Sequence, residues 1–127
     1  MPKPLPRFIL LYVSSPSASA RFYETLLGRP PLEASPSFAM FALDAGLMLG
    51  LWSRDTVEPA PPAQAQAGLG ELGFPVEDIA AVDGLHREWT ALGLPVLQPP
   101  TRMDFGYTFV AADPDGHRLR VFAQEGA

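Results

Sequence analysis

LLYVSSPSASARFYETLLG, residues 10–28, contains a short apolar stretch followed by a segment with clear helix start and stop signals. Residues 7–13 are rich in β-branched and aromatic side chains, which favours a β-strand. Ser15 can cap the helix that follows, Pro16 suits its first turn and Gly28 ends it. The stretch therefore predicts a strand that leads directly into a helix.

The same order of elements is predicted twice along the chain. After the first helix, apolar stretches predict three further strands, at residues 30–35, 37–43 and 46–52. Residues 58–69 have no hydrophobic periodicity and are typical of a linker. Beyond them the order returns, with a strand at 70–76, a helix capped by Asp78, and three strands of which the last two flank a turn at 113–116.

Equivalent residues mark this repeat. Leu11 and Val13 lie 63 residues before Phe74 and Val76, which is about half of the chain. Self-similarity at a fixed spacing indicates an internal duplication. We therefore predict an α+β fold of two βαβββ modules, residues 5–57 and 70–124, within a single domain of residues 1–127.

Composition limits the classes of function. The chain has 127 residues, 47% of them hydrophobic, which is enough to bury a core. Its net charge is −5 and it has no basic run, so nucleic acid and anionic membranes are poor partners. The absence of cysteine excludes disulfides, thiolate metal sites and a cysteine nucleophile. The first apolar run is too short for a signal peptide or membrane span, so we expect a cytoplasmic location.

Two segments carry a family resemblance. Residues 10–28, quoted above, resemble the opening of proteins of the vicinal oxygen chelate superfamily (glyoxalase/bleomycin resistance protein/dioxygenase), and DPDGHRLRVF, residues 113–122, resembles their closing hairpin. Within the superfamily the sequence is most similar to the small phenazine- and antibiotic-resistance binding proteins. The resemblance implies that the modules form curved sheets around a cup, which a homodimer usually completes.

The resemblance also implies where metal ligands would lie. Side chains two apart in a strand share a face, and this alternation puts the family's four ligand positions on Phe8, Gly50, Glu71 and Arg120. Divalent metals need several converging oxygen or nitrogen donors, and a permanently charged guanidinium repels them. We therefore predict no metal ligands and no cofactor. Glu71 and Arg120 either pair with each other or bind a polar ligand.

The predicted inward side chains describe the ligand class. Aromatic faces and adaptable methionines suit a flat, hydrophobic, conjugated molecule. The candidate ligand-binding residues are Phe8, Tyr12, Phe38, Met40, Met48, Trp52, Glu71, Arg120 and Phe122, with Phe105 and Tyr107 in a possible rim or lid at residues 102–107. Three of these have a competing interpretation: Trp52 as a core or dimer-interface residue, Phe8 as filler of the old metal cavity, and the 102–107 loop as a structural turn.

Three hypotheses about function follow from this reading. The favoured one is a metal-free binding protein, without catalytic residues, that sequesters a small planar aromatic compound such as a phenazine antibiotic. The second is a metal-dependent enzyme of the glyoxalase or dioxygenase type with an atypical site. The third is a structural or regulatory dimer whose cup is filled by its own side chains. The expected partners are the aromatic ligand and a second copy of the chain.

Overall fold

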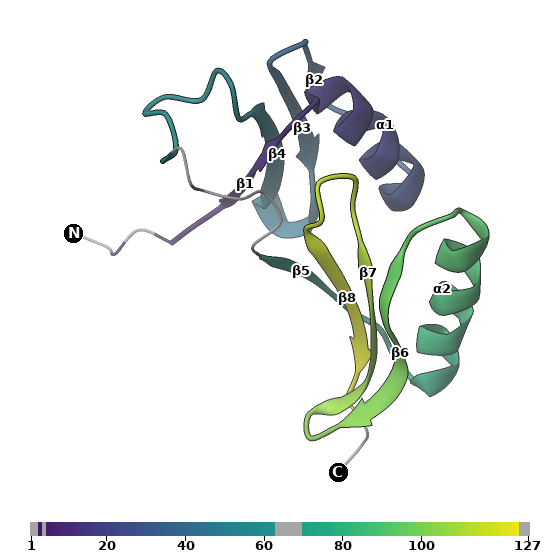
Figure 1. The fold of residues 1–127 in the computed structure, drawn as a ribbon. Coiled ribbons are helices and arrows are strands. Elements are labelled where there is room, and N and C mark those ends of the chain that lie inside the picture. The colour runs from purple at the N-terminus through teal and green to yellow at the C-terminus, as the bar shows by residue number, and fades with distance from the viewer. Residues whose placement is uncertain (1–2, 4, 63–69, 125–127) are drawn as a thin grey trace. The chain divides into compact units, whose positions relative to one another are not determined.

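The computed structural model describes residues 3, 5–62 and 70–124, which form two helices and two four-stranded sheets (Figure 1). The chain divides into two compact units, residues 1–67 and 68–127, and each is a βαβββ module. The predicted α+β fold with an internal repeat is therefore confirmed. Of the predicted linker, residues 63–69 lie outside the described residues.

The first module has one helix against one sheet. Its elements are β1 (Phe8–Val13), α1 (Pro16–Leu27), β2 (Glu33–Ala34), β3 (Phe38–Ala42), a 3₁₀ turn (Asp44–Gly46) and β4 (Met48–Ser53). The strand order is β1-β4-β3-β2, with β1 parallel to β4 and the other pairs antiparallel. As predicted, the Ser15 hydroxyl accepts a hydrogen bond from the Ala18 backbone N–H at 3.2 Å, and Gly28 ends α1 in the left-handed conformation.

Strand alternation separates the two faces of this sheet. Tyr23 of α1 is fully buried, as are the sheet residues that face the helix: Val13, Ala39, Phe41, Leu49 and Leu51. The opposite face carries Phe8, Leu10 and Tyr12 of β1, all exposed. We call the face of each sheet that points away from its helix the open face.

The second module repeats this arrangement. Its elements are β5 (Glu71–Pro75), α2 (Ile79–Ala91), β6 (Val96–Met103), β7 (Gly106–Ala112) and β8 (Arg118–Ala123). The strand order is β5-β8-β7-β6, again with the first pair parallel. The Asp78 carboxylate caps α2 by accepting a hydrogen bond from the Ala81 N–H at 2.8 Å, as predicted. Val82, Trp89, Phe109, Leu119 and Val121 form the buried core.

The predicted turn between the last two strands is closed by a buried ionisable pair. One carboxylate oxygen of Asp113 accepts hydrogen bonds from the backbone N–H groups of Asp115 and His117, at 2.9 and 2.8 Å. The other lies 2.9 Å from the His117 imidazole, and both side chains are almost inaccessible. The contacts of His117 with Asp113 therefore give the histidine a structural role in the turn.

Two further expectations concern the surroundings of the protein. No helix in the described ranges has the length and hydrophobicity needed to cross a membrane. The homodimer and the cytoplasmic location stay predictions.

Candidate ligand-binding site

A pocket of about 500 Å³ lies on the open face of the first module. Within the described ranges, strands and the turn after β2 contribute seven lining residues: Phe8, Leu10, Glu33, Ser35, Ser37, Phe38 and Trp52. Its walls are thus mainly aromatic and aliphatic, with a carboxylate and two hydroxyls at one side. Three of the predicted ligand-binding residues, Phe8, Phe38 and Trp52, are brought together there.

Strand register explains why these side chains meet. In the parallel pair β1–β4, Leu10 lies opposite Gly50, and in the antiparallel pair β3–β4, Phe38 lies opposite Trp52. A Cβ atom added at Gly50 would lie 2.6 Å from Leu10 Cδ2, 2.9 Å from Phe8 Cε1 and 3.2 Å from Phe38 Cζ. Gly50 therefore leaves the space over which the three side chains pack.

Two aromatic side chains of the pocket contact each other with a defined geometry. The rings of Phe38 and Trp52 are 6.1 Å apart at an interplanar angle of 87°, an edge-to-face contact. Both are half-buried, whereas Phe8 is exposed. Part of the surface of each of the three rings is therefore accessible to a ligand in the pocket.

Three predicted residues share the open face without lining the pocket. Tyr12 pairs with Trp52 in the β1–β4 ladder, and Met40 lies opposite Gly50 in the β3–β4 ladder. Met48 lies beside Phe8. Strand alternation thus predicted the face of the sheet on which these three side chains lie. The pocket extends toward β2 and does not include them.

Sequence reasoning missed four lining residues. Leu10 had a usable signal, because it shares its face of β1 with Phe8 and Tyr12. Glu33, Ser35 and Ser37 had none, since β2 is two residues long and the turn that follows it has no alternation to extend. The Ser35 hydroxyl fixes this turn: it accepts a hydrogen bond from the Phe38 N–H at 3.2 Å.

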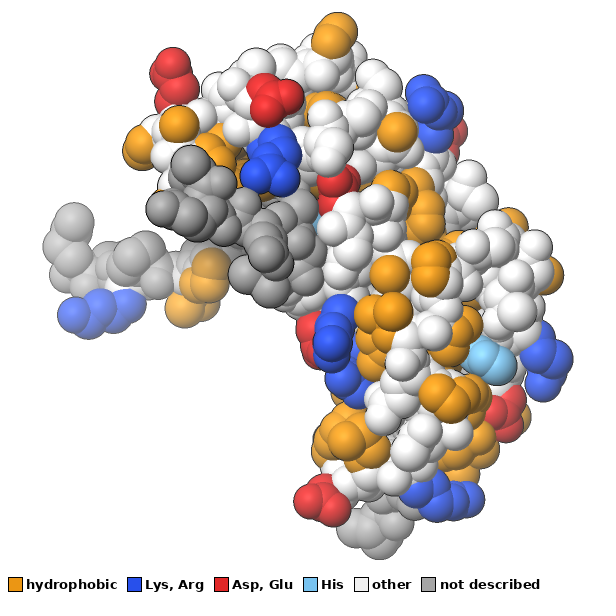
Figure 2. Space-filling model, in the orientation of Figure 1, with side chains coloured by type: hydrophobic (Ala, Val, Ile, Leu, Met, Phe, Trp, Pro, Cys, Tyr) orange, Lys and Arg blue, Asp and Glu red, His pale blue; other side chains and the backbone are white. Residues whose placement is uncertain are grey.

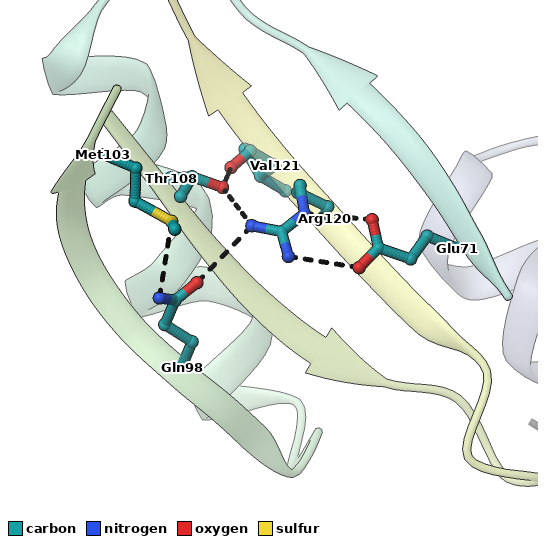
Figure 3. Close-up of polar contacts among 6 residues, drawn as sticks. All are labelled: Glu71, Gln98, Met103, Thr108, Arg120 and Val121. Atoms are coloured by element: carbon teal, nitrogen blue, oxygen red, sulfur yellow. Dashed lines mark hydrogen bonds and ion pairs between the residues drawn. The ribbon is translucent and has the colours of Figure 1, made fainter. Parts of the chain in front are cut away.

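The open face of the second module carries a different constellation, centred on Arg120 (Figure 3). Its Nε and Nη2 atoms donate to the two carboxylate oxygens of Glu71, at 3.0 and 3.1 Å. Its Nη1 atom donates to Gln98 Oε1 and to Thr108 Oγ1, both at 3.4 Å. Thr108 in turn donates to the backbone carbonyl of Val121 at 2.8 Å. All three guanidinium nitrogens therefore have partners.

Charge and aromatic contacts surround this pair. The hydrogen bonds from Arg120 are the main cause that lowers the pKa of Glu71, so the carboxylate is ionised at neutral pH. The guanidinium lies 5.8 Å from the ring centroid of Phe105, which contacts Phe122 edge-to-face at 6.3 Å. Phe105 and the neighbouring Met103 are exposed, and Figure 2 shows hydrophobic side chains over the strands of this module.

Tyr107 does not join this group. Its hydroxyl donates to the Asp83 carboxylate of α2 at 2.9 Å, which places the side chain on the helix face of the sheet. That hydrogen bond is the first cause of its raised pKa. Residues 104 and 105 form a tight turn between β6 and β7, so the structure gives the 102–107 segment a hairpin role, with Phe105 at its tip.

The side chains at the family's metal positions do not fit a metal ion. Phe8 and Gly50 offer no donor atom, and Glu71 is held by both oxygens on a guanidinium. Across residues 3, 5–62 and 70–124, no group of three or more His, Cys, Asp or Glu side chains is placed to hold one. The donor set is therefore unsuited to divalent cations, which need several converging oxygen or nitrogen ligands.

Several known proteins are similar to this chain in sequence or in fold. The phenazine antibiotic resistance protein EhpR of Enterobacter agglomerans is 29% identical in an alignment of 119 residues that covers 91% of this chain and 89% of EhpR. A protein from Agrobacterium tumefaciens, solved by NMR in solution, is 53% identical with a TM-score of 0.87, over 98% of this chain and 100% of that one.

A crystal structure of a glyoxalase/bleomycin resistance protein/dioxygenase from Nocardioides has a TM-score of 0.82 over 100% of this chain and 88% of that one. Its identity is 24%, so it shows the fold alone. The sequence itself matches the superfamily over residues 7–121, which cover nearly all of both modules. The chain therefore belongs to the glyoxalase/bleomycin resistance protein/dioxygenase superfamily.

Proposed function

We propose that this protein binds a small planar aromatic compound of the phenazine type and sequesters it without metal chemistry. The observation that carries the proposal is the pocket on the open face of the first module, whose aromatic walls are Phe8, Phe38 and Trp52. A volume of about 500 Å³ lies within the range of small-molecule sites. A three-ring aromatic compound stacks on such walls through dispersion and quadrupole contacts.

Two further observations support binding over catalysis. At the family's metal positions, Phe8 and Gly50 lack donor atoms, and Glu71 is paired with the Arg120 guanidinium. These residues do not supply the set of metal ligands that the metal-dependent alternative requires. The relative EhpR is named for resistance to a phenazine antibiotic, which is consistent with a member that acts by holding its ligand. The pocket also argues against a cup filled by its own side chains.

Titration of the protein with phenazine tests the proposal. The chain has two tryptophans, and Trp89 lies in the core of the second module, so Trp89→Phe leaves Trp52 as the sole indole. We expect saturable quenching of Trp52 fluorescence in that background. In equilibrium dialysis, Trp52→Ala should weaken binding about tenfold, the effect of removing ~1.4 kcal/mol of stacking and burial.

The matched control is Tyr12→Ala, since Tyr12 neighbours Trp52 on the open face and does not line the pocket. We expect this variant to retain nearly all of the wild-type affinity. Absence of saturable phenazine binding to the wild-type protein would refute the proposal. Equal losses in the two alanine variants would place the ligand elsewhere on this face.

A further inference from the structure

We infer that the pocket of the first module selects planar aromatic compounds that carry a positive charge over those that carry a carboxylate. The inference rests on the proposed function and adds the charge of the ligand to it. It follows from the polar residues that line the pocket, from its aromatic rings, and from the positions of arginines in the same module.

Glu33 supplies the only ionisable group among the seven lining residues. It is exposed at the start of β2 and has no ion-pair or hydrogen-bond partner within the described part of the chain. The other polar lining groups are the hydroxyls of Ser35 and Ser37, which carry no charge. A carboxylate beside an apolar wall attracts a cation and repels an anion.

Aromatic rings add to this preference. The faces of Phe8, Phe38 and Trp52 carry the negative end of the ring quadrupole, and a cation within about 6 Å of such a face is attracted. The ring planes of Phe38 and Trp52 are nearly perpendicular, at 87°, so the two rings form two adjacent walls. Three rings and a carboxylate around one space form the type of cage that binds organic cations.

Two arginines of the same module are engaged outside the pocket. Arg7 donates to the backbone carbonyl of Ala45 at 3.4 Å. Arg29 donates to the carbonyl of Ala42 at 2.9 Å and lies 3.8 Å from the Asp44 carboxylate. Among the described residues no arginine or lysine lines the pocket, so they offer an anionic ligand no countercharge there. The net charge of −5 also attracts cationic ligands and repels anionic ones, at longer range.

Three ligands of nearly equal size and different charge test the inference: phenazine, N-methylphenazinium and phenazine-1-carboxylate, each titrated by calorimetry at pH 7 in the dark. We expect N-methylphenazinium to bind the wild-type protein about fivefold more tightly than phenazine, from an exposed charge pair and cation–π contacts together worth ~1 kcal/mol. The carboxylate should bind more weakly than phenazine. Added salt should reduce the difference between cation and anion.

Glu33→Gln removes the charge and keeps the shape of the side chain. We expect it to bring the affinity for N-methylphenazinium close to that for phenazine, with phenazine binding unchanged. Glu24→Gln, on the exposed surface of α1, changes the net charge equally without touching the pocket and should leave the preference as in the wild type.

The outcomes separate this inference from the proposed function. Equal affinities for cation and neutral ligand, tighter binding of the carboxylate, or the same effect of Glu33→Gln and Glu24→Gln would overturn the charge selection while phenazine binding stands. If none of the three ligands binds, the proposed function fails and the inference fails with it.

Discussion

Arg120 lies where the family resemblance puts a metal-binding carboxylate, and its surroundings explain how a cation is accommodated there. Glu71 supplies the countercharge through two parallel hydrogen bonds, and Gln98 and Thr108 accept from the remaining nitrogen. Bidentate pairing of this kind is stronger and more directional than a single contact. Of the two roles predicted for these residues, the structure contains the mutual pair; the contact with a ligand stays a prediction.

This pair predicts how stability depends on pH. Arg120 lowers the pKa of Glu71 in the folded protein, so the pair contributes fully above the pKa of an unfolded glutamate, about 4.3. The contribution is lost as the pH falls through the lowered folded pKa. The Glu71 side chain is 40% exposed, so solvent screening limits its worth to about 1 kcal/mol or less.

Urea unfolding of the wild type and Glu71→Gln at a series of pH values from 7 down to 3 measures this dependence. We expect Glu71→Gln to be less stable at pH 7 and the difference to shrink toward zero at the acid end. Glu24→Gln controls for the loss of a carboxylate from the surface. A stability difference that does not change with pH would show that the lowered pKa has no energetic consequence.

Among the elements, the β6–β7 hairpin depends on a glycine. Gly106 begins β7 with φ of +145°, a conformation that side chains with a Cβ rarely adopt. A Cβ at this position would overlap the backbone carbonyl of Ala123 on the neighbouring strand β8, which cannot move aside as a flexible side chain can. The hairpin that carries Phe105 at its tip is therefore intolerant of substitution at Gly106.

We expect Gly106→Ala to lower the free energy of unfolding by at least about 2 kcal/mol, from backbone strain and the steric conflict together. Gly70→Ala is the matched control, because a Cβ at Gly70 meets no atom within 4 Å. Chemical denaturation of both variants measures the difference. Equal stability of the two would mean that the hairpin relaxes around the added methyl group.

The helices and strands were easier to predict from the sequence than the contacts between side chains. The cap residues Ser15 and Asp78, together with the spacing of 63 residues between repeated positions, were sufficient to predict both modules, because these signals are local or periodic. Alternation predicted that Phe8 and Trp52 lie on the open face. Tyr107 was predicted at a rim because residues 102–107 were interpreted as a loop; β7 instead starts at Gly106, and its register turns that side chain toward Asp83.

For the whole molecule, the residues at the family's metal positions predict its behaviour toward metals. We expect the purified protein, incubated with zinc, nickel, manganese or iron(II) and then desalted, to retain far less than one metal ion per chain. The physical reason is the shortage of converging donors at Phe8, Gly50, Glu71 and Arg120. Mass spectrometry of the metals measures the ratio. A ratio near one would revive the metalloenzyme alternative.

The packing around Gly50 makes this position a poor place to add a metal ligand. In the superfamily this position is expected to carry a ligand, yet here Phe8, Leu10 and Phe38 already occupy the space into which any side chain would grow. A methyl group forces the ends of these flexible side chains to shift, and an imidazole or carboxylate would have to displace all three. A single substitution that placed a donor side chain at Gly50 would therefore disturb the packing of the pocket before it provided a metal ligand.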